Sequence, residues 1–216
     1  MTAPLSAAIL VGGRSTRMGQ NKALLRLTPN GPSVIQTIVG TLTDLADEVF
    51  LAGTDVTAAD YAALGLRHVP DVVPNAGALG GIHAALGAAS HTHILVVACD
   101  MPFLNAGLLA HMAGLPRDYD ALVPLIGRPH PLHAIYARAA LPVIETRLVA
   151  RRFRVTGWFA SAKVQIIPRA TFAMFDPDLR SCFNMNGPDD FARAQQIVRQ
   201  AESRRMHHSR ESMRSE

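Results

Sequence analysis

Short apolar segments alternate with segments of helical periodicity along the first 115 residues. Continuous apolar runs, which predict buried strands, lie at residues 6–11, 48–51, 67–69 and 93–99. Apolar positions that recur at helical spacing predict helices at residues 34–45, 57–64, 79–89 and 105–114. Alternation of strands and helices is typical of a parallel sheet that is covered by helices on both faces.

The second half of the chain is less regular. Strands are expected at 121–124, 132–136 and 164–167, and helices at 141–150 and 188–200. Residues 203–216 have no apolar periodicity, and we expect them to be a disordered tail. The pattern predicts an α/β protein with a three-layer, Rossmann-like fold: an open, mostly parallel sheet with helices on both faces. We expect one domain over residues 1–202, with a first half at about 1–115 and a second at about 116–202.

Composition excludes several classes of protein. Of the 216 residues, 49% are hydrophobic and 18% are charged, which excludes disorder for most of the chain. Cys99 and Cys182 are the two cysteines, and their separation argues against a disulfide scaffold or a zinc module. No apolar run approaches the roughly 20 residues of a membrane span, and no basic-then-apolar leader opens the chain. We therefore expect a soluble, cytoplasmic protein that binds neither membranes nor nucleic acid.

The positive charge is concentrated in one stretch. Residues 128–169 contain eight Lys or Arg residues and one acid, Glu145, although the net charge of the whole chain is only +4. Such a stretch forms either a solvated helix face or a surface that recognises an anion.

The loop after the first strand, residues 12–22, carries candidate chemistry. Gly12 and Gly13 allow backbone N–H groups to approach a ligand, and Arg14, Arg17 and Lys22 supply positive charge. This combination is suited to a polyphosphate. The loop contains neither a Walker sequence nor the Gly-x-Gly-x-x-Gly dinucleotide fingerprint.

Carboxylates follow two further strands. Asp71 opens a loop rich in proline and glycine, where it either caps a turn or contacts a ligand. Asp100 follows the most apolar strand, and a buried carboxylate at that position needs a partner. Magnesium fits, because it takes one or two carboxylates and bridges phosphates, while a helix cap is the simpler alternative. Since ligands of open α/β sheets bind at the carboxyl ends of the strands, we expect these loops to meet.

These motifs resemble those of one family. Residues 10–22 (LVGGRSTRMGQNK) are similar to the signature of nucleotidyltransferases of the sugar-nucleotide pyrophosphorylase type. Within that group the chain most resembles the molybdenum cofactor guanylyltransferases. Further similar segments are Asp71-x-x-Pro-x-x-Gly-x-Leu-x-Gly, Cys99-Asp-Met-Pro, His130-Pro-Leu-His-Ala and Asn184-Met-Asn186-Gly-Pro-Asp-Asp.

The resemblance implies an enzyme that transfers GMP from GTP to the terminal phosphate of molybdenum-bound molybdopterin and releases pyrophosphate, with Mg²⁺ as cofactor. It further implies partners that insert molybdenum, and molybdoenzyme chaperones. The nucleotide contacts that it implies are Leu10, Val11, Gly12, Gly13, Lys22, Asp71 and Asp100. By the same resemblance, Asp100 binds the metal, and Asn184 and Asn186 lie on the acceptor side.

Charge neutralisation is the central requirement of this reaction, because an anionic phosphate must attack an anionic triphosphate. Lys22, Asp100 and Arg17 are therefore the candidate catalytic residues, with Arg17 and Lys22 holding the leaving pyrophosphate. The acceptor phosphate is already ionised near neutral pH, so no general base is needed. The arginines at positions 128, 151, 152 and 154 are candidates for holding the acceptor.

Other functions stay open at this stage. The chain departs from the family pattern at Leu51-Ala52-Gly53, where an asparagine is common, and at Ala78, where a proline is common. The first departure leaves open a CTP-dependent molybdopterin cytidylyltransferase or another NTP-dependent nucleotidyltransferase. A GTP-binding protein without catalytic activity is an alternative of a different class.

Overall fold

The computed structural model describes residues 3–12, 21–53 and 61–212, with side chains up to Arg204 in the last helix. Two predicted site residues, Gly13 and Arg17, lie outside the described residues, as does the first half (57–60) of the helix predicted at 57–64.

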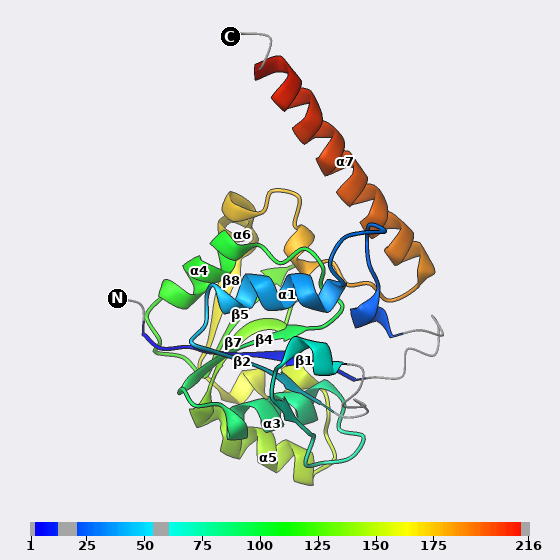
Figure 1. Ribbon diagram of the computed structural model, residues 1–216. Coiled ribbons are helices and arrows are strands. Elements are labelled where there is room, and N and C mark those ends of the chain that lie inside the picture. The colour runs from blue at the N-terminus through cyan, green and yellow to red at the C-terminus, as the bar shows by residue number, and fades with distance from the viewer. Residues whose placement is uncertain (1–2, 13–20, 54–60, 213–216) are drawn as a thin grey trace.

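A mixed sheet forms the centre of the molecule (Figure 1). Within the described residues its order is β3-β2-β1-β4-β7-β5-β6, and β8 pairs in parallel with β5. The β1–β2, β1–β4 and β2–β3 pairs are parallel, whereas β7 runs antiparallel to both β4 and β5. The strands are β1 (Ser6–Leu10), β2 (Glu48–Ala52), β3 (His68–Val69), β4 (His93–Ala98), β5 (Ala121–Ile126), β6 (Arg128–Pro129), β7 (His133–Ala137) and β8 (Val164–Pro168).

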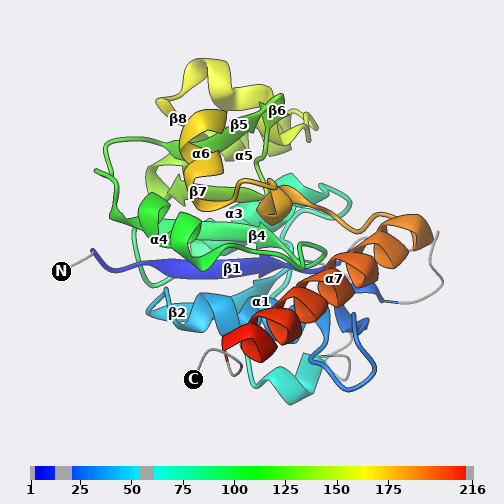
Figure 2. The same cartoon turned by 90° about the horizontal axis from the view of Figure 1, so that it is seen from above.

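Helices cover both faces of this sheet, as Figures 1 and 2 show, which confirms the predicted three-layer α/β fold. One apolar core joins the sheet to α1, α4 and α6, and the other joins it to α3 and α5. The α-helices are α1 (Val34–Thr43), α3 (Ala78–Ala88), α4 (Ala106–Gly114), α5 (Leu141–Val149), α6 (Arg169–Phe175) and α7 (Pro188–Ser212). The 3₁₀ helices are η1 (Lys22–Leu24), η2 (Ala62–Leu64), η3 (Arg138–Ala140), η4 (Val155–Ser161) and η5 (Arg180–Cys182).

Local chemistry starts the helices where the sequence predicted. Ser33 accepts a hydrogen bond from Gln36 N and forms a capping box at the start of α1. Asn105 accepts from Leu108 N at 2.8 Å and caps α4. All seven predicted strands are present, while β6 and α6 were not predicted. The expectation of a disordered tail from residue 203 is wrong as far as Ser212, because α7 continues to that residue.

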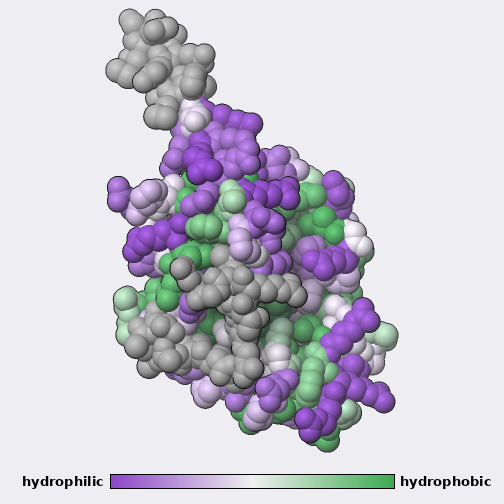
Figure 3. Space-filling view, turned by 90° about the vertical axis from the view of Figure 1, so that its right-hand side faces the viewer, coloured by the Kyte–Doolittle hydropathy of each residue, from purple (hydrophilic) through white to green (hydrophobic). Residues whose placement is uncertain are grey.

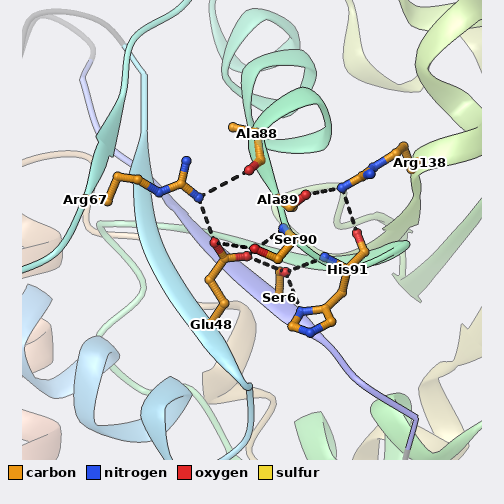
Figure 4. A network of polar contacts seen from close by, with 8 residues as sticks. All are labelled: Ser6, Glu48, Arg67, Ala88, Ala89, Ser90, His91 and Arg138. Carbon is orange, nitrogen blue, oxygen red and sulfur yellow. Dashed lines mark hydrogen bonds and ion pairs between the residues drawn. The ribbon is translucent and has the colours of Figure 1, made fainter.

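A polar network joins the amino-terminal ends of the central strands (Figure 4). Glu48 accepts hydrogen bonds from Ser6 Oγ at 2.7 Å, Ser90 N at 2.8 Å and Arg67 Nη2 at 2.7 Å. Ser6 Oγ also lies 2.9 Å from His91 Nδ1. Burial alone would raise the pKa of Glu48, but these hydrogen bonds outweigh it and hold the pKa below its ordinary value. The network ties β1 and β2 to the segment that enters β4.

We expect Glu48→Gln to lower the free energy of unfolding at pH 7 by about 1–3 kcal/mol, because charge-assisted hydrogen bonds are lost. Since the pKa of Glu48 is lower in the folded state, its contribution is complete above the unfolded pKa and disappears as the pH falls through the folded pKa. Urea denaturation between pH 3 and 7 should therefore show a steeper acid loss in the wild type than in Glu48→Gln. Exposed Asp44→Asn is the control, and an equal effect of both substitutions would contradict the role of the network.

Candidate functional site

A cavity of about 480 Å³ lies at the carboxyl ends of the parallel strands. It brings together seven residues that the sequence analysis singled out from four separate segments of the chain. The lining residues are Leu10, Val11, Gly12, Ala52, Gly53, Asp71, Asn75, Gly77, Ala78, Gly81, Ala98, Cys99, Asp100, Leu132, Asn184 and Asn186. The expectation that the strand-end loops meet is therefore confirmed for the described residues.

The end of β1 forms one wall of the cavity. Leu10 pairs with Ala52 on one side and Ala98 on the other, so this strand lies in the middle of the parallel part of the sheet. Val11 N donates to Ala52 O at 2.9 Å, and Gly12 then takes a φ of 109°. A positive φ is accessible to glycine at little cost, which explains a glycine where the chain leaves the strand.

Lys22 is not among the residues that line the cavity, but its charge acts on two residues that are. It begins η1, whose first turn is capped by Asn21, and Asn21 Nδ2 donates in turn to Tyr61 Oη at 2.9 Å. The positive charge of Lys22 acts on the carboxylate of Asp100 and on the thiol of Cys99. Lys22 is thus close enough for its charge to act on Asp100, as the sequence-based mechanism requires.

Asp100 directly follows β4 and its extension, Cys99. Burial raises the pKa of Asp100 and the neighbouring Asp190 adds to the rise, while Lys22 and a hydrogen bond from Asn184 oppose it. Asn184 Nδ2 donates to Asp100 Oδ1 at 3.1 Å, and Met185 N donates to Asp100 O at 3.0 Å. The segment from Asn184 therefore fixes both the side chain and the backbone of Asp100.

A buried pair of side chains anchors that segment. His133 Nε2 on β7 lies 2.7 Å from Ser181 Oγ in η5, and both residues are completely buried. Burial lowers the pKa of His133 to about 4, so its ring is neutral at pH 7. Ser181 N also donates to Asp176 Oδ2 at 2.6 Å. Sequence reasoning had matched His133 only as part of a motif and had not identified this support.

Asp71 lies against the first turn of α3. A Cβ built on Gly80 would stand 3.4 Å from Asp71 Cγ, and one on Gly81 would stand 3.6 Å from Asp71 Oδ1. The carboxylate thus packs on the amino-terminal turn of a helix, where the helix dipole favours negative charge. The two glycines are explained by closer contacts, because the same added Cβ atoms would stand 2.9 Å from Ala76 Cβ and 3.2 Å from Leu10 Cδ2.

The acidic start of α7 adds a group that sequence reasoning missed. Asp190 Oδ2 accepts from Asn186 N at 2.8 Å and from Gly187 N at 3.2 Å. Its charge also acts on Asp100, although only Asn186 of this turn lines the cavity. In the sequence, the segment Asn184-Met-Asn186-Gly-Pro-Asp-Asp was the local signal that could have indicated a role for Asp190.

The arginines expected at the acceptor do not form one patch. Arg128 and Arg154 line a neighbouring cavity of about 320 Å³, which shares Leu132 and Asn184 with the first. Arg151, whose φ is 54°, lines a separate hollow beside Asn75, and Arg152 is exposed. Arg151 and Arg154 therefore do not line the same cavity, although the sequence analysis had grouped them.

The donors around Asp100 fit magnesium better than a metal held entirely by the protein. Among the described residues, no three His, Cys, Asp or Glu side chains converge as a metal site. Asp100 has a second oxygen besides the one bonded to Asn184, and Asp190 is the nearby second carboxylate. Magnesium usually takes one or two carboxylates and completes its shell with water and substrate phosphates.

The strand ends of this open α/β sheet present a glycine and a half-buried carboxylate at one cavity, and a lysine acts on that carboxylate. This arrangement defines a nucleotide-binding protein of the doubly wound class. Residues 7–161 match the MobA-like NTP transferase domain. The chain belongs to this family and is a nucleotidyltransferase.

Relatives and solved structures agree with this placement. The chain is 35% identical over 203 residues to a probable molybdenum cofactor guanylyltransferase of Pelotomaculum thermopropionicum, covering 93% of this chain and 97% of the relative. It is 36% identical to a protein of the same description from Carboxydothermus hydrogenoformans, covering 89% and 96%. The crystal structure of molybdopterin-guanine dinucleotide biosynthesis protein A from Archaeoglobus fulgidus superposes with a TM-score of 0.78 at 29% identity, covering 90% and 99%. No described helix is both long and apolar enough to cross a membrane.

Proposed function

We propose that the chain transfers GMP from GTP to the terminal phosphate of molybdenum-bound molybdopterin, forming molybdopterin guanine dinucleotide and pyrophosphate. The family and the names of the relatives support this activity. The observation that carries it is the convergence of Asp71, Asp100 and the Gly12 turn on one cavity, with the charge of Lys22 acting on Asp100.

Each residue of the cavity has a separate task in this proposal. Lys22 neutralises the phosphates of the bound nucleotide, and the backbone at Gly12 approaches them closely. Asn184 holds the Asp100 carboxylate in a fixed orientation through the 3.1 Å hydrogen bond. Asp100 holds Mg²⁺, which supplies neutralisation of phosphate charge when bound. Alignment and neutralisation are the main demands of a phosphoryl-type transfer.

The acceptor lies in the cavity of Arg128 and Arg154 in this proposal, because that cavity adjoins the nucleotide cavity at Asn184. Its phosphate is mainly dianionic at pH 7 and needs no general base to attack. The arginines hold the acceptor, and the shared wall at Asn184 and Leu132 directs its phosphate toward the nucleotide.

Separate incubations of the protein and Mg²⁺ with molybdopterin and either GTP or CTP, with or without molybdate, test the activity and the choice of base. We expect a dinucleotide product, identified by mass spectrometry, with GTP alone. Product from CTP alone would overturn the guanylyl assignment. A related guanylyltransferase, assayed under the same conditions, is the positive control. If that enzyme forms the dinucleotide and this chain binds GTP without forming it, the chain is a non-catalytic GTP-binding protein.

We expect Arg154→Gln to raise the KM for the acceptor about tenfold and to leave the KM for GTP nearly unchanged, because one charge-assisted hydrogen bond to the acceptor is lost. Steady-state kinetics with each substrate varied in turn measure both constants. Arg152→Gln, which removes the same charge from an exposed position that does not line the acceptor cavity, is the control. Equal rises in the two KM values would reject the assignment of this cavity to the acceptor.

A further inference from the structure

A third cavity, of about 560 Å³, lies beyond the acceptor cavity and takes no part in the mechanism above. Its walls come from the β5–β6 turn, from the segment around η5 and from the first half of α7. The lining residues are Ile126, Arg128, His130, Asp178, Leu179, Arg180, Cys182, Phe183, Arg193, Gln196, Ile197 and Gln200. Figure 1 shows α7 running outward from the body of the molecule, and the described part of this helix is mostly hydrophilic in Figure 3.

Positive charge dominates this cavity. Arg180 pairs with Asp178 at 2.8 Å, but both side chains are partly exposed, so a stronger anion can compete for the guanidinium. Arg193 lies over the Phe183 ring, with Cζ 5.7 Å from its centroid. Within the described part of the chain, neither Arg128 nor Arg193 has an ion-pair partner. Three guanidinium groups against one carboxylate leave an excess of two positive charges.

Apolar side chains complete the lining. Ile126, Leu179, Phe183 and Ile197 are all half-buried and come from the same three walls as the arginines. A free inorganic anion would use the guanidinium groups but would leave this surface uncovered. A ligand with an anionic group and a flat, weakly polar body would use both, and the volume lies in the usual range for small-molecule sites.

The cavity is connected to the proposed reaction site through shared residues. Arg128 and His130 line both this cavity and the acceptor cavity, and Asn184 and Leu132 line both the acceptor and the nucleotide cavities. Arg128 therefore lines both cavities, and a ligand in either of them can contact its guanidinium group.

We propose that this third cavity is a second ligand site, which takes a phosphate ester of a planar heterocycle and holds it one cavity away from the place of transfer. The acceptor proposed above belongs to this chemical class. It would therefore bind first in the third cavity and then move to the acceptor cavity at Arg154. This second statement rests on the proposed function, whereas the binding of such an ester does not.

Riboflavin 5′-phosphate serves as a fluorescent probe of this class, and riboflavin is its counterpart without phosphate. Fluorescence anisotropy with the full chain should show binding of the phosphate ester that is at least about tenfold tighter than that of riboflavin. The double variant Arg180→Gln/Arg193→Gln should lose at least about tenfold in affinity for the ester, because two charge-assisted contacts disappear. The matched control is Arg169→Gln/Arg199→Gln, which removes the same charge from exposed positions outside the cavity.

The variants also separate this cavity from its neighbours. Arg180→Gln/Arg193→Gln should lower the affinity for the probe more than Arg154→Gln or Asp100→Asn does, and an equal or larger loss in either of these would place the probe elsewhere and overturn the proposal. An equal loss in the Arg169/Arg199 control, or equal binding of riboflavin, would overturn it too. In transfer assays, Arg180→Gln/Arg193→Gln should raise the acceptor KM without changing kcat or the KM for GTP. Absence of any transfer in the wild type would refute the proposed function while leaving the binding result to decide the cavity.

Discussion

Asp100→Asn is expected to lower the rate of GMP transfer by about 10²-fold or more while leaving the fold intact. The substitution keeps the shape of the side chain and removes its negative charge, so the site loses the group proposed to hold Mg²⁺. Asp190, the nearby second carboxylate, accepts hydrogen bonds from Asn186 N and Gly187 N and does not line the cavity, so it is not placed to replace Asp100. Initial rates of dinucleotide formation at saturating GTP, Mg²⁺ and acceptor measure the effect.

The control for this experiment is Asp189→Asn, which makes the same chemical change at an exposed position in the first turn of α7. Circular dichroism should show that both variants keep the wild-type melting temperature within a few degrees. Lys22→Ala should cause a loss of the same order as Asp100→Asn. Because the two charges act on each other, the double variant should lose less than the product of the two single effects. More than a tenth of the wild-type rate in Asp100→Asn would contradict its role.

The sequence predicted this site because strand ends are readable from local patterns. Apolar runs ending at Val11 and at Cys99 identify parallel strands, and the carboxyl ends of such strands must meet at one edge of the sheet. The type of residue placed there, glycine or carboxylate, then indicates the chemistry. Neither step needs knowledge of distant contacts, which is why Asp71 and Asp100 were both identified.

Local sequence patterns could not predict the contacts between segments that are distant in the chain. The His133–Ser181 pair joins residues 48 positions apart, and the influence of Asp190 on Asp100 spans the sheet and the last helix. In both pairs, nothing in the local sequence around one residue indicates which residue is its partner. The charge count over residues 128–169 likewise treated a folded stretch as one surface, although Arg151 and Arg154 line different hollows.

The length of α7 shows a different limit. Apolar periodicity predicts the part of a helix that packs on a core, and the buried Ala194 lies within the predicted range. Beyond Gln200 the helix continues to Ser212 without such a pattern. Residues 201–212 include Ala, Glu, Arg and Met, which are good helix formers, so intrinsic propensity favours continuation of the helix where burial no longer indicates it.

Gly53→Ala is expected to lower the free energy of unfolding by more than about 3 kcal/mol, the largest effect on stability that we expect from a single methyl group. Gly53 has a φ of +136°, and an added Cβ would stand 1.8 Å from Val11 O. The clash is with backbone, so it can be relieved only if β1 and β2 separate at their ends. Val11 and Gly12 line the nucleotide cavity, so GTP affinity should fall as well.

Gly65→Ala separates the two causes of this loss. Gly65 also has a positive φ, +63°, but nothing lies within 4 Å of its added Cβ. Only the cost of a left-handed alanine remains there, about 1–2 kcal/mol. Urea denaturation of both variants, with GTP titration of the folded protein, measures stability and binding together. If Gly53→Ala were no less stable than Gly65→Ala, close approach of the β2 end to Val11 would not be what requires glycine at this edge of the cavity.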